Sequence, residues 1–409
     1  MTDFIRCVRA LAPAMLLAAA VGAHAQNVKL EYRLDLTDAP EAARASVTVI
    51  QSDGELRTLR FKPETGRFTD FAADTPLSDE DGRMTWTVPE NGGTLSWRAP
   101  ITNVRSNDAL DARLGNRWAL FRAEDAFPSM ASRAAADTEV TATLNVDLPE
   151  EWSFLSALSQ ADEGWQVEDT PRRIDRPTGW MIAGAIGVRI DRIAGVRSVV
   201  AAPRGQKVRR QDILALLNWV MPDLVRVLPD YPMDLLIVSA EDPFWRGGLS
   251  GPASLYLHAD RPLISENGTS TLVHELFHVG FRRPGGPKDD WIIEGLAEFY
   301  SVQLLRRSGS TTASRYDKTL RSLERWAKKA GPLRVSRSSG ATTARAVGVF
   351  VALDEEIRRA SRASLDDVVR VLAAGEGAVT LDELREAVTA TMGARSAVLA
   401  AIDAPAEDD

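Results

Sequence analysis

The chain has 409 residues, of which 44% are hydrophobic and 26% charged, as is typical of a globular protein. This length is enough for two or three domains. The formal net charge is −8, and no block of Lys and Arg interrupts the sequence, which argues against nucleic acid as a partner.

Residues 1–25 have the features of a secretory signal. Arg6 and Arg9 precede an apolar run over residues 11–21, and the small residues at 23–25 resemble a cleavage site. An uncleaved anchor is the alternative, but the run is short for a spanning helix, and no other stretch approaches that length. We therefore expect a periplasmic or secreted protein without stable membrane insertion. The only cysteine, Cys7, lies in this segment, so the mature chain has no disulfide and no thiolate ligand.

Residues 26–150 are predicted to form a β-rich domain. Apolar and charged residues alternate from 28 to 36, as in a strand with one buried face. Further strands are expected at 47–51, 56–61, 84–88 and 140–148, while residues 105–130 fit no pattern. The run Asn91-Gly92-Gly93 predicts a hairpin that joins 84–88 to a strand at 95–97. The whole is expected to be β-sandwich-like.

After residue 150 the predicted helix content of the chain increases. Residues 151–310 combine predicted strands at 180–190, 198–202, 233–239 and 253–258 with helices at 211–227 and 290–305. Residues 311–409 are expected to be a helical C-terminal region. The fold class is therefore α+β and multidomain.

The strongest motif is His274-Glu275-Leu276-Phe277-His278. On a helix, residues four apart share one face, so both imidazoles can bind one metal ion. Glu275 follows the first ligand and is placed to act on a water molecule beside the metal. Glu294, in the next predicted helix, is expected to be the third ligand that a catalytic zinc site requires.

The helix that carries this motif has recognisable ends. Thr269 or Ser270 can cap its first turn, and Gly280 and Pro284 are expected to end it. Leu272, and the apolar residues that recur after it, predict the face that packs into the core.

These residues resemble the gluzincin metallopeptidases, in particular the glycyl aminopeptidase family and, more distantly, the aminopeptidase N family. The resemblance is carried by HELFH at 274–278, Arg282-Arg283-Pro284, WIIEGLAEFY at 291–300 and a stretch at 348–372. It implies a thermolysin-like catalytic domain with zinc as cofactor, with His274, His278 and Glu294 as its ligands. Glu275 would then be the general base and acid.

Glu298 lies one turn after Glu294 on the same helix face. There it can accept the free ring N–H of a ligating histidine, a contact that fixes the orientation of the ring. The alternative is an ordinary exposed helix glutamate.

The sequence departs from the family at two positions. In the relatives a tyrosine stabilises the oxyanion, and in this sequence Arg345 stands at that position. Arg345 could take over this role or be an ordinary surface arginine. The other possible replacements are Tyr256, His258 and Tyr316, although His258 could instead serve only in packing. The glutamate that holds the substrate amine in the relatives is replaced by Ser250, unless Glu241 or Asp242 reaches the same place.

The expected function is a secreted zinc metallopeptidase that acts on a peptide or protein substrate. The altered positions keep an alternative open, a metal-binding member of the family that acts as a binding or chaperone-like protein. A purely structural protein would leave the motif unexplained. The substrate sequence, the position of the cleaved bond and the oligomeric state stay undetermined at this stage.

Overall fold

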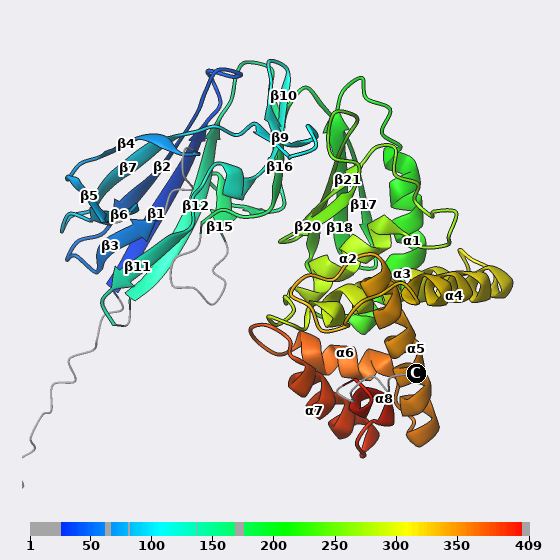
Figure 1. The fold of residues 1–409 in the computed structure, drawn as a ribbon. Coiled ribbons are helices and arrows are strands. Elements are labelled where there is room, and N and C mark those ends of the chain that lie inside the picture. Colours follow the sequence, from blue (N-terminus) through cyan, green and yellow to red (C-terminus); the bar gives the residue numbers. More distant parts are fainter. Residues whose placement is uncertain (1–25, 62–66, 81, 137, 168–175, 403–409) are drawn as a thin grey trace, which may run out of the picture.

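The computed structural model describes residues 26–61, 67–80, 82–136, 138–167 and 176–402, so the predicted signal at 1–25 lies outside it. The fold of the described residues is mixed α and β: it has four sheets, and all of its α-helices except α1 follow the last strand (Figure 1). Among the described residues, no helix is both long and apolar enough to cross a membrane.

Two sheets pack on one apolar core at the N-terminal end. The larger sheet has the strand order β14-β15-β12-β1-β2-β7-β4, and the smaller has the order β11-β3-β6-β5. Side chains of both enter the same core, among them Leu30, Leu59 and Trp86. Their bounds are β1 (Gln26–Asp35), β2 (Ala43–Ile50), β3 (Leu56–Phe61), β4 (Thr69–Ala73), β5 (Leu77–Glu80), β6 (Arg83–Thr87), β7 (Gly93–Ala99), β11 (Met130–Ala134), β12 (Thr138–Asp147), β14 (Ser159–Gln160) and β15 (Trp165–Val167).

The predicted hairpin at Asn91-Gly92-Gly93 is wrong. Strand β6 pairs with β3 and β5, whereas β7 pairs with β2 and β4, so this turn carries the chain from one sheet to the other. Gly92 has a φ of +83°, and a Cβ there would lie 2.1 Å from the carbonyl oxygen of Val49. The glycine is required for the tight approach of the turn to β2, and not for a hairpin.

A third sheet joins the N-terminal part to the rest of the chain. Its order is β13-β16-β10-β9-β8, with β8 (Asn103–Val104), β9 (Leu110–Leu114), β10 (Trp118–Arg122), β13 (Ser153–Ser156) and β16 (Trp180–Gly184). The region 105–130 that fits no sequence pattern supplies two of these strands. The sequence predicts a domain boundary at residue 150, but strands on both sides of it pair with each other: β16 pairs with β10, and β15 pairs with β12. The boundary itself stays a prediction.

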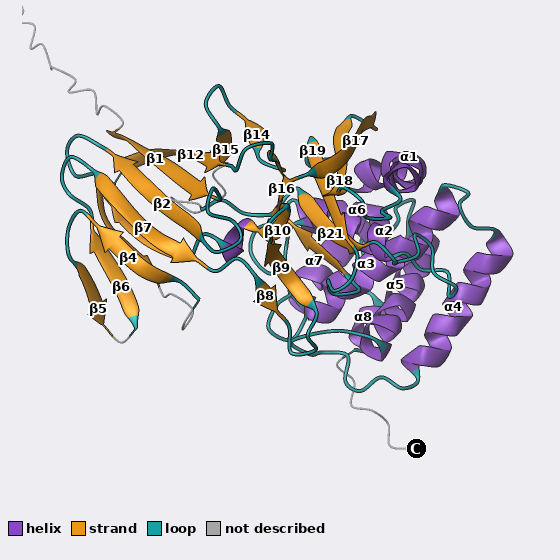
Figure 2. Cartoon of the chain, turned by 90° about the horizontal axis from the view of Figure 1, so that it is seen from above, coloured by secondary structure: helices purple, strands orange, loops and turns teal. Residues whose placement is uncertain are grey.

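The fourth sheet supports the motif helix. Its order is β17-β18-β19-β21-β20, with β17 (Ile186–Ile193), β18 (Val196–Pro203), β19 (Asp234–Ala240), β20 (Gly248–Gly251) and β21 (Ser254–His258). Alternate residues of β21 enter different cores: Leu255 and Leu257 pack with the helices, and Tyr256 packs with Trp180 of β16. The helices therefore cover one face of this sheet and the third sheet covers the other (Figure 2).

The described residues also contain eight α-helices, most of them in regions where the helical periodicity predicts helix. They are α1 (Arg210–Val227), α2 (Thr271–Phe281), α3 (Asp290–Arg307), α4 (Ala313–Ala327), α5 (Ala341–Ala360), α6 (Leu365–Ala373), α7 (Leu381–Met392) and α8 (Ala397–Ala400). Helices α1, α2, α3, α5, α6 and α7 share one apolar core with the fourth sheet.

Arg283, which follows α2, connects the motif region to the C-terminal helices. Its side chain is 7% exposed, and its guanidinium forms an ion pair with Glu383 at 2.7 Å. It also donates to the carbonyl oxygens of Leu372, Glu376 and Gly377. One side chain thus ties the end of α2 to α6, to α7 and to the loop between them.

Candidate metal centre

The motif helix begins where the sequence predicts it. The Ser270 side chain accepts a hydrogen bond from the backbone N–H of Val273, which satisfies one free donor of the first turn. The helix ends at Phe281, with Arg282 after it in the left-handed conformation, and not at Gly280. Gly280 lies inside the helix, and the absence of a side chain there makes room for Tyr231, since a Cβ would come within 2.5 Å of its ring.

The structure brings three predicted ligands together. The Nε2 atoms of His274 and His278 are 3.1 Å apart, and they lie 3.4 and 3.5 Å from the carboxylate oxygens of Glu294. Helix α2 supplies both histidines and α3 supplies the glutamate. This group is the one set of three metal-binding side chains found in the described part of the chain.

The donor atoms fit a zinc ion. Ligand atoms that each lie about 2.1 Å from a tetrahedral metal are about 3.4 Å from one another, close to the three separations seen here. Two imidazoles and one carboxylate are also the ligands of one common class of catalytic zinc site. The three side chains are 16–30% exposed, so the site is open to solvent on one side.

Glu298 contacts the outer nitrogen of a predicted ligand. Its Oε2 lies 3.2 Å from Nδ1 of His274, so His274 can donate there and keep Nε2 directed at the other ligands. The hydroxyl of Ser301 donates to the same oxygen at 3.4 Å. This contact is the one that an orienting role for Glu298 would use, and the role itself stays a prediction.

Glu275 is held apart from the three ligands, against the edge strand β20. Its Oε2 accepts a hydrogen bond of 2.8 Å from the backbone N–H of Ser250. The approach is close enough to exclude a side chain at Gly248, where a Cβ would lie 2.8 Å from Cγ of Glu275. No sequence pattern points to this contact, because its donor is a main-chain group that almost every residue has.

The charges of the cluster are strongly coupled. Burial raises the pKa of Glu275, and this outweighs the opposing effects of His274 and of Ser250. Burial lowers the pKa of His274, but its hydrogen bonds to Glu294 and Glu298 outweigh this and raise it to about 10. Burial and the adjacent His274 cation lower the pKa of His278 to about 4. The pKa of His274 is thus raised and that of His278 lowered, so His274 is the histidine of the pair that the surroundings favour as the charged imidazolium.

The structure does not bring the candidate replacements for the oxyanion tyrosine to the three ligands. Arg345 is exposed on α5 and donates to the carbonyl oxygen of Gly331. Tyr256 and His258 lie on β21, where Tyr256 faces away from α2 and donates to the carbonyl oxygen of Trp245. Tyr316 accepts a hydrogen bond from Gln303.

The acidic candidates for an amine anchor are likewise engaged elsewhere. Glu241 accepts from the backbone N–H of Lys207 at 2.5 Å. Asp242 pairs with Arg246 and lies 3.3 Å from Nε2 of the buried His258. Neither has a contact with Ser250 or with the metal ligands among the interactions of the described residues.

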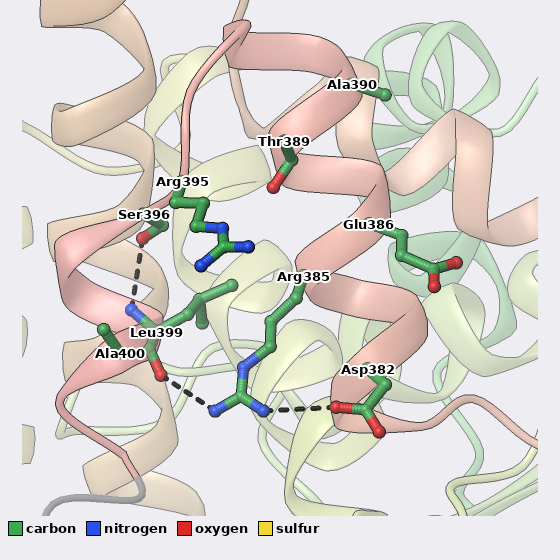
Figure 3. Close-up of a pocket in the computed structure, with 9 residues that line it drawn as sticks. All are labelled: Asp382, Arg385, Glu386, Thr389, Ala390, Arg395, Ser396, Leu399 and Ala400. Atoms are coloured by element: carbon green, nitrogen blue, oxygen red, sulfur yellow. Dashed lines mark hydrogen bonds and ion pairs between the residues drawn. The ribbon is translucent and has the colours of Figure 1, made fainter.

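A cavity of about 740 Å³ reaches the centre. His278 and Ser250 form part of its wall, and residues 157–159 from the N-terminal part form another side of it. A second cavity, of about 850 Å³, lies between α7 and α8, where Arg385 donates to Asp382 and to the carbonyl oxygen of Leu399 (Figure 3). None of the motif residues lines the second cavity.

Neither protein-family models nor curated protein sequences give a match to the chain. Solved structures do match. An aminopeptidase N family protein from Idiomarina loihiensis has a TM-score of 0.61 and 15% identity, over 93% of this chain and 74% of that one. An M1 zinc metallopeptidase from Deinococcus radiodurans has a TM-score of 0.58 and 14% identity, over 92% of each chain.

Aminopeptidase A from Legionella pneumophila has a TM-score of 0.59 and 14% identity, over 92% of this chain and 49% of that one. At these identities the likeness concerns the fold, and it agrees with the family resemblance of the motifs. The chain has a gluzincin, aminopeptidase-like fold similar to that of the M1 zinc metallopeptidases.

Proposed function

We propose that the chain is a zinc-dependent metallopeptidase that is exported to the periplasm or beyond. The observation that carries the proposal is the cluster of His274, His278 and Glu294, with the separate carboxylate of Glu275 beside it. In this proposal residues 26–150 are a β-rich domain, 151–310 the thermolysin-like catalytic domain and 311–409 a helical region.

In this proposal the metal ion and the side chains of the protein have separate roles in peptide hydrolysis. A zinc ion held by the three ligands would polarise the scissile carbonyl and make a water molecule more acidic. Glu275 takes a proton from that water as general base, and its raised pKa suits it to pass the proton on to the leaving amine. The N–H of Ser250 fixes one oxygen of Glu275, so the carboxylate keeps its orientation between the two transfers.

The cavity beside the candidate metal centre and the similar solved structures favour a peptide as the substrate. The cavity beside His278 and Ser250 has the volume of a small-molecule or short-peptide site. One similar structure, a mutant of the Deinococcus radiodurans enzyme, is described as bound to a Tyr-Ser-Ala substrate, and the Legionella pneumophila enzyme as bound to aspartic acid. We infer a peptide substrate for this chain as well.

Two substitutions test the proposal. Glu275→Gln should retain about one zinc per chain and lose hydrolysis, because an amide cannot accept the proton of the water. Glu294→Ala should lose the zinc, because two remaining ligands hold it poorly. Glu355→Gln, on the exposed side of α5, is the matched control and should change neither zinc content nor turnover.

The outcomes separate the two functions considered. A wild-type protein that binds zinc but hydrolyses no peptide in a broad peptide mixture would favour the binding or chaperone-like alternative. Full turnover in Glu275→Gln would remove this glutamate from the mechanism.

A further inference from the structure

Strand β17 forms a free edge of the fourth sheet. It pairs with β18 on one side, and no described strand pairs with its other side. Residues 189–192 of this strand are all exposed. Figure 2 shows β17 at the outside of the sheet, next to α1. An edge strand presents a row of backbone N–H and C=O groups, to which another extended strand can bind.

The hairpin that joins β17 to β18 determines which backbone groups point to the free edge. Its turn has two residues, Ala194 and Gly195, with φ of +49° and +89°, and the residues on either side of such a turn exchange hydrogen bonds. Bonded and non-bonded pairs alternate along antiparallel strands. Val188, Ile190 and Arg192 are therefore in non-bonded pairs with β18, and their N–H and C=O groups point outward.

Two opposite charges lie at this edge. Nη1 of Arg189 donates to the outward carbonyl oxygen of Val188 at 3.0 Å, and the outward N–H of Arg192 donates to Oδ1 of Asp191 at 2.8 Å. Asp191 also accepts a hydrogen bond of 3.3 Å from Asn218 of α1, so it lies on the face of the sheet that α1 covers. Arg189, two residues earlier, shares that face. Neither of the two forms an ion pair with another described residue.

The charges of β17 are complementary to those of a second β17. When two copies of this strand pair antiparallel about a two-fold axis at Ile190, Arg189 of each copy lies opposite Asp191 of the partner subunit. These are non-hydrogen-bonded pairs, in which side chains approach most closely. An axis at 189 or 191 would use the same backbone groups but would place like charges opposite each other. The charges therefore favour one register.

Exposed apolar side chains accompany the edge. Ile190 is 57% exposed, and at the two-fold axis it would lie beside its own copy. Trp219 is also 57% exposed, and it follows Asn218, whose side chain contacts Asp191. Pairing of two edges would bring apolar surface together as well as charge.

We propose that β17 is the interface of a symmetric dimer, in which two copies of this chain pair antiparallel about an axis at Ile190 and join their fourth sheets into one. The ion pairs between Arg189 and Asp191 of the partner subunit set the register. Glu275 contacts β20, the opposite edge of the same sheet, so the dimer forms away from the candidate metal centre. The inference is independent of the proposed peptidase function.

Charged side chains on an edge strand can instead prevent pairing. Charge reversal separates the two roles. Sedimentation velocity over a range of concentrations is measured for the wild type, for Arg189→Asp, for Asp191→Arg and for the double variant with both changes. Arg57→Asp is the matched control, because Arg57 is an exposed arginine of β3, which has a strand on each side. Circular dichroism checks the fold of each variant.

The wild type should dimerise with a dissociation constant on the order of 1 to 10 μM, as expected of a small interface. Each single reversal places like charges opposite each other twice, so it should raise this constant about 10- to 100-fold. The double variant restores opposite charges in the same register and should recover most of the affinity. The control should associate as the wild type does.

Cross-linking tests the axis without a change of charge. Ile190→Cys in a Cys7→Ser background leaves one thiol in the chain. The two Cα atoms of this hydrogen-bonded pair would be about 5.5 Å apart, so a short bis-maleimide should join the two copies. Ile50→Cys in the same background is the control, because Ile50 is 46% exposed on a different sheet.

Four results would overturn the proposal. The first is a wild type that stays monomeric at about 100 μM. The second is a single reversal that associates as tightly as the wild type or more tightly, as expected if the charges prevent pairing. The third is a double variant no tighter than the single ones, since Arg189 and Asp191 would then not face each other. The fourth is cross-linking of Ile190→Cys no faster than that of Ile50→Cys.

Discussion

Removing the carboxylate of Glu298 should weaken zinc binding without removing a zinc ligand. Its Oε2 lies 3.2 Å from Nδ1 of His274, and the two side chains are 19% and 16% exposed, so water screens the contact only partly. Loss of a carboxylate that orients a metal-bound histidine typically lowers metal affinity 10- to 100-fold, or about 1.4 to 2.7 kcal/mol. We expect Glu298→Ala near the upper value, because it removes the acceptor and the charge together.

Glu298→Gln should fall near the lower value, because the amide oxygen can still accept the N–H but carries no charge. The assay is competition for zinc with a chelator of known affinity at pH 7. Glu324→Gln, exposed on α4, is the control. A zinc affinity of Glu298→Ala within twofold of the wild type would refute the reasoning and return Glu298 to an ordinary helix glutamate.

Three further predictions follow from the same geometry. Arg283→Ala should lower the free energy of unfolding by about 3 to 5 kcal/mol in urea denaturation, since it leaves the buried side of Glu383 and three carbonyl oxygens without their donor. Zinc must displace the proton of His274, whose pKa is raised to about 10, so apparent zinc affinity should rise about tenfold per pH unit from pH 6 to 8. Calorimetry in two buffers should show one proton released. With Ser250 in place of an amine-binding glutamate, free and N-acetylated forms of one peptide should be cleaved at rates within tenfold of each other.

Each of these has a contrary result. An unfolding midpoint unchanged in Arg283→Ala would mean that α6 and α7 pack without this clamp. A zinc affinity independent of pH would place the proton elsewhere than on His274. A preference for the free amine well beyond tenfold would show that an amine anchor exists, and Ser250→Glu would then add little to it.

The local parts of the site could be predicted from the sequence because they depend on spacing along one helix. The four-residue interval of His274 and His278 and the cap at Ser270 are properties of α2 alone. Glu294 and Glu298 are likewise one turn apart on α3. The structure adds that the two helices cross so that these faces meet.

What the sequence could not predict depends on contacts between distant segments. The turn at Gly92 has the composition of a hairpin, but the choice between two sheets is made by pairing with β2 and β3, about 30 to 50 residues earlier in the sequence. Gly280 has the composition of a helix end, but it lies inside α2, where the packing of Tyr231 leaves no room for a side chain.

The core that β10 and β16 share with the back of the fourth sheet limits how this protein can be shortened. Leu120 and Ile182 of these strands cover Val238 and Tyr256, and Phe244 lies in the same core. A fragment that began after β16 would expose this apolar face to water and present a surface prone to aggregation. A fragment with only the fourth sheet and the helices is therefore a poor target for expression, and any minimal fragment that includes the candidate metal centre must retain the third sheet.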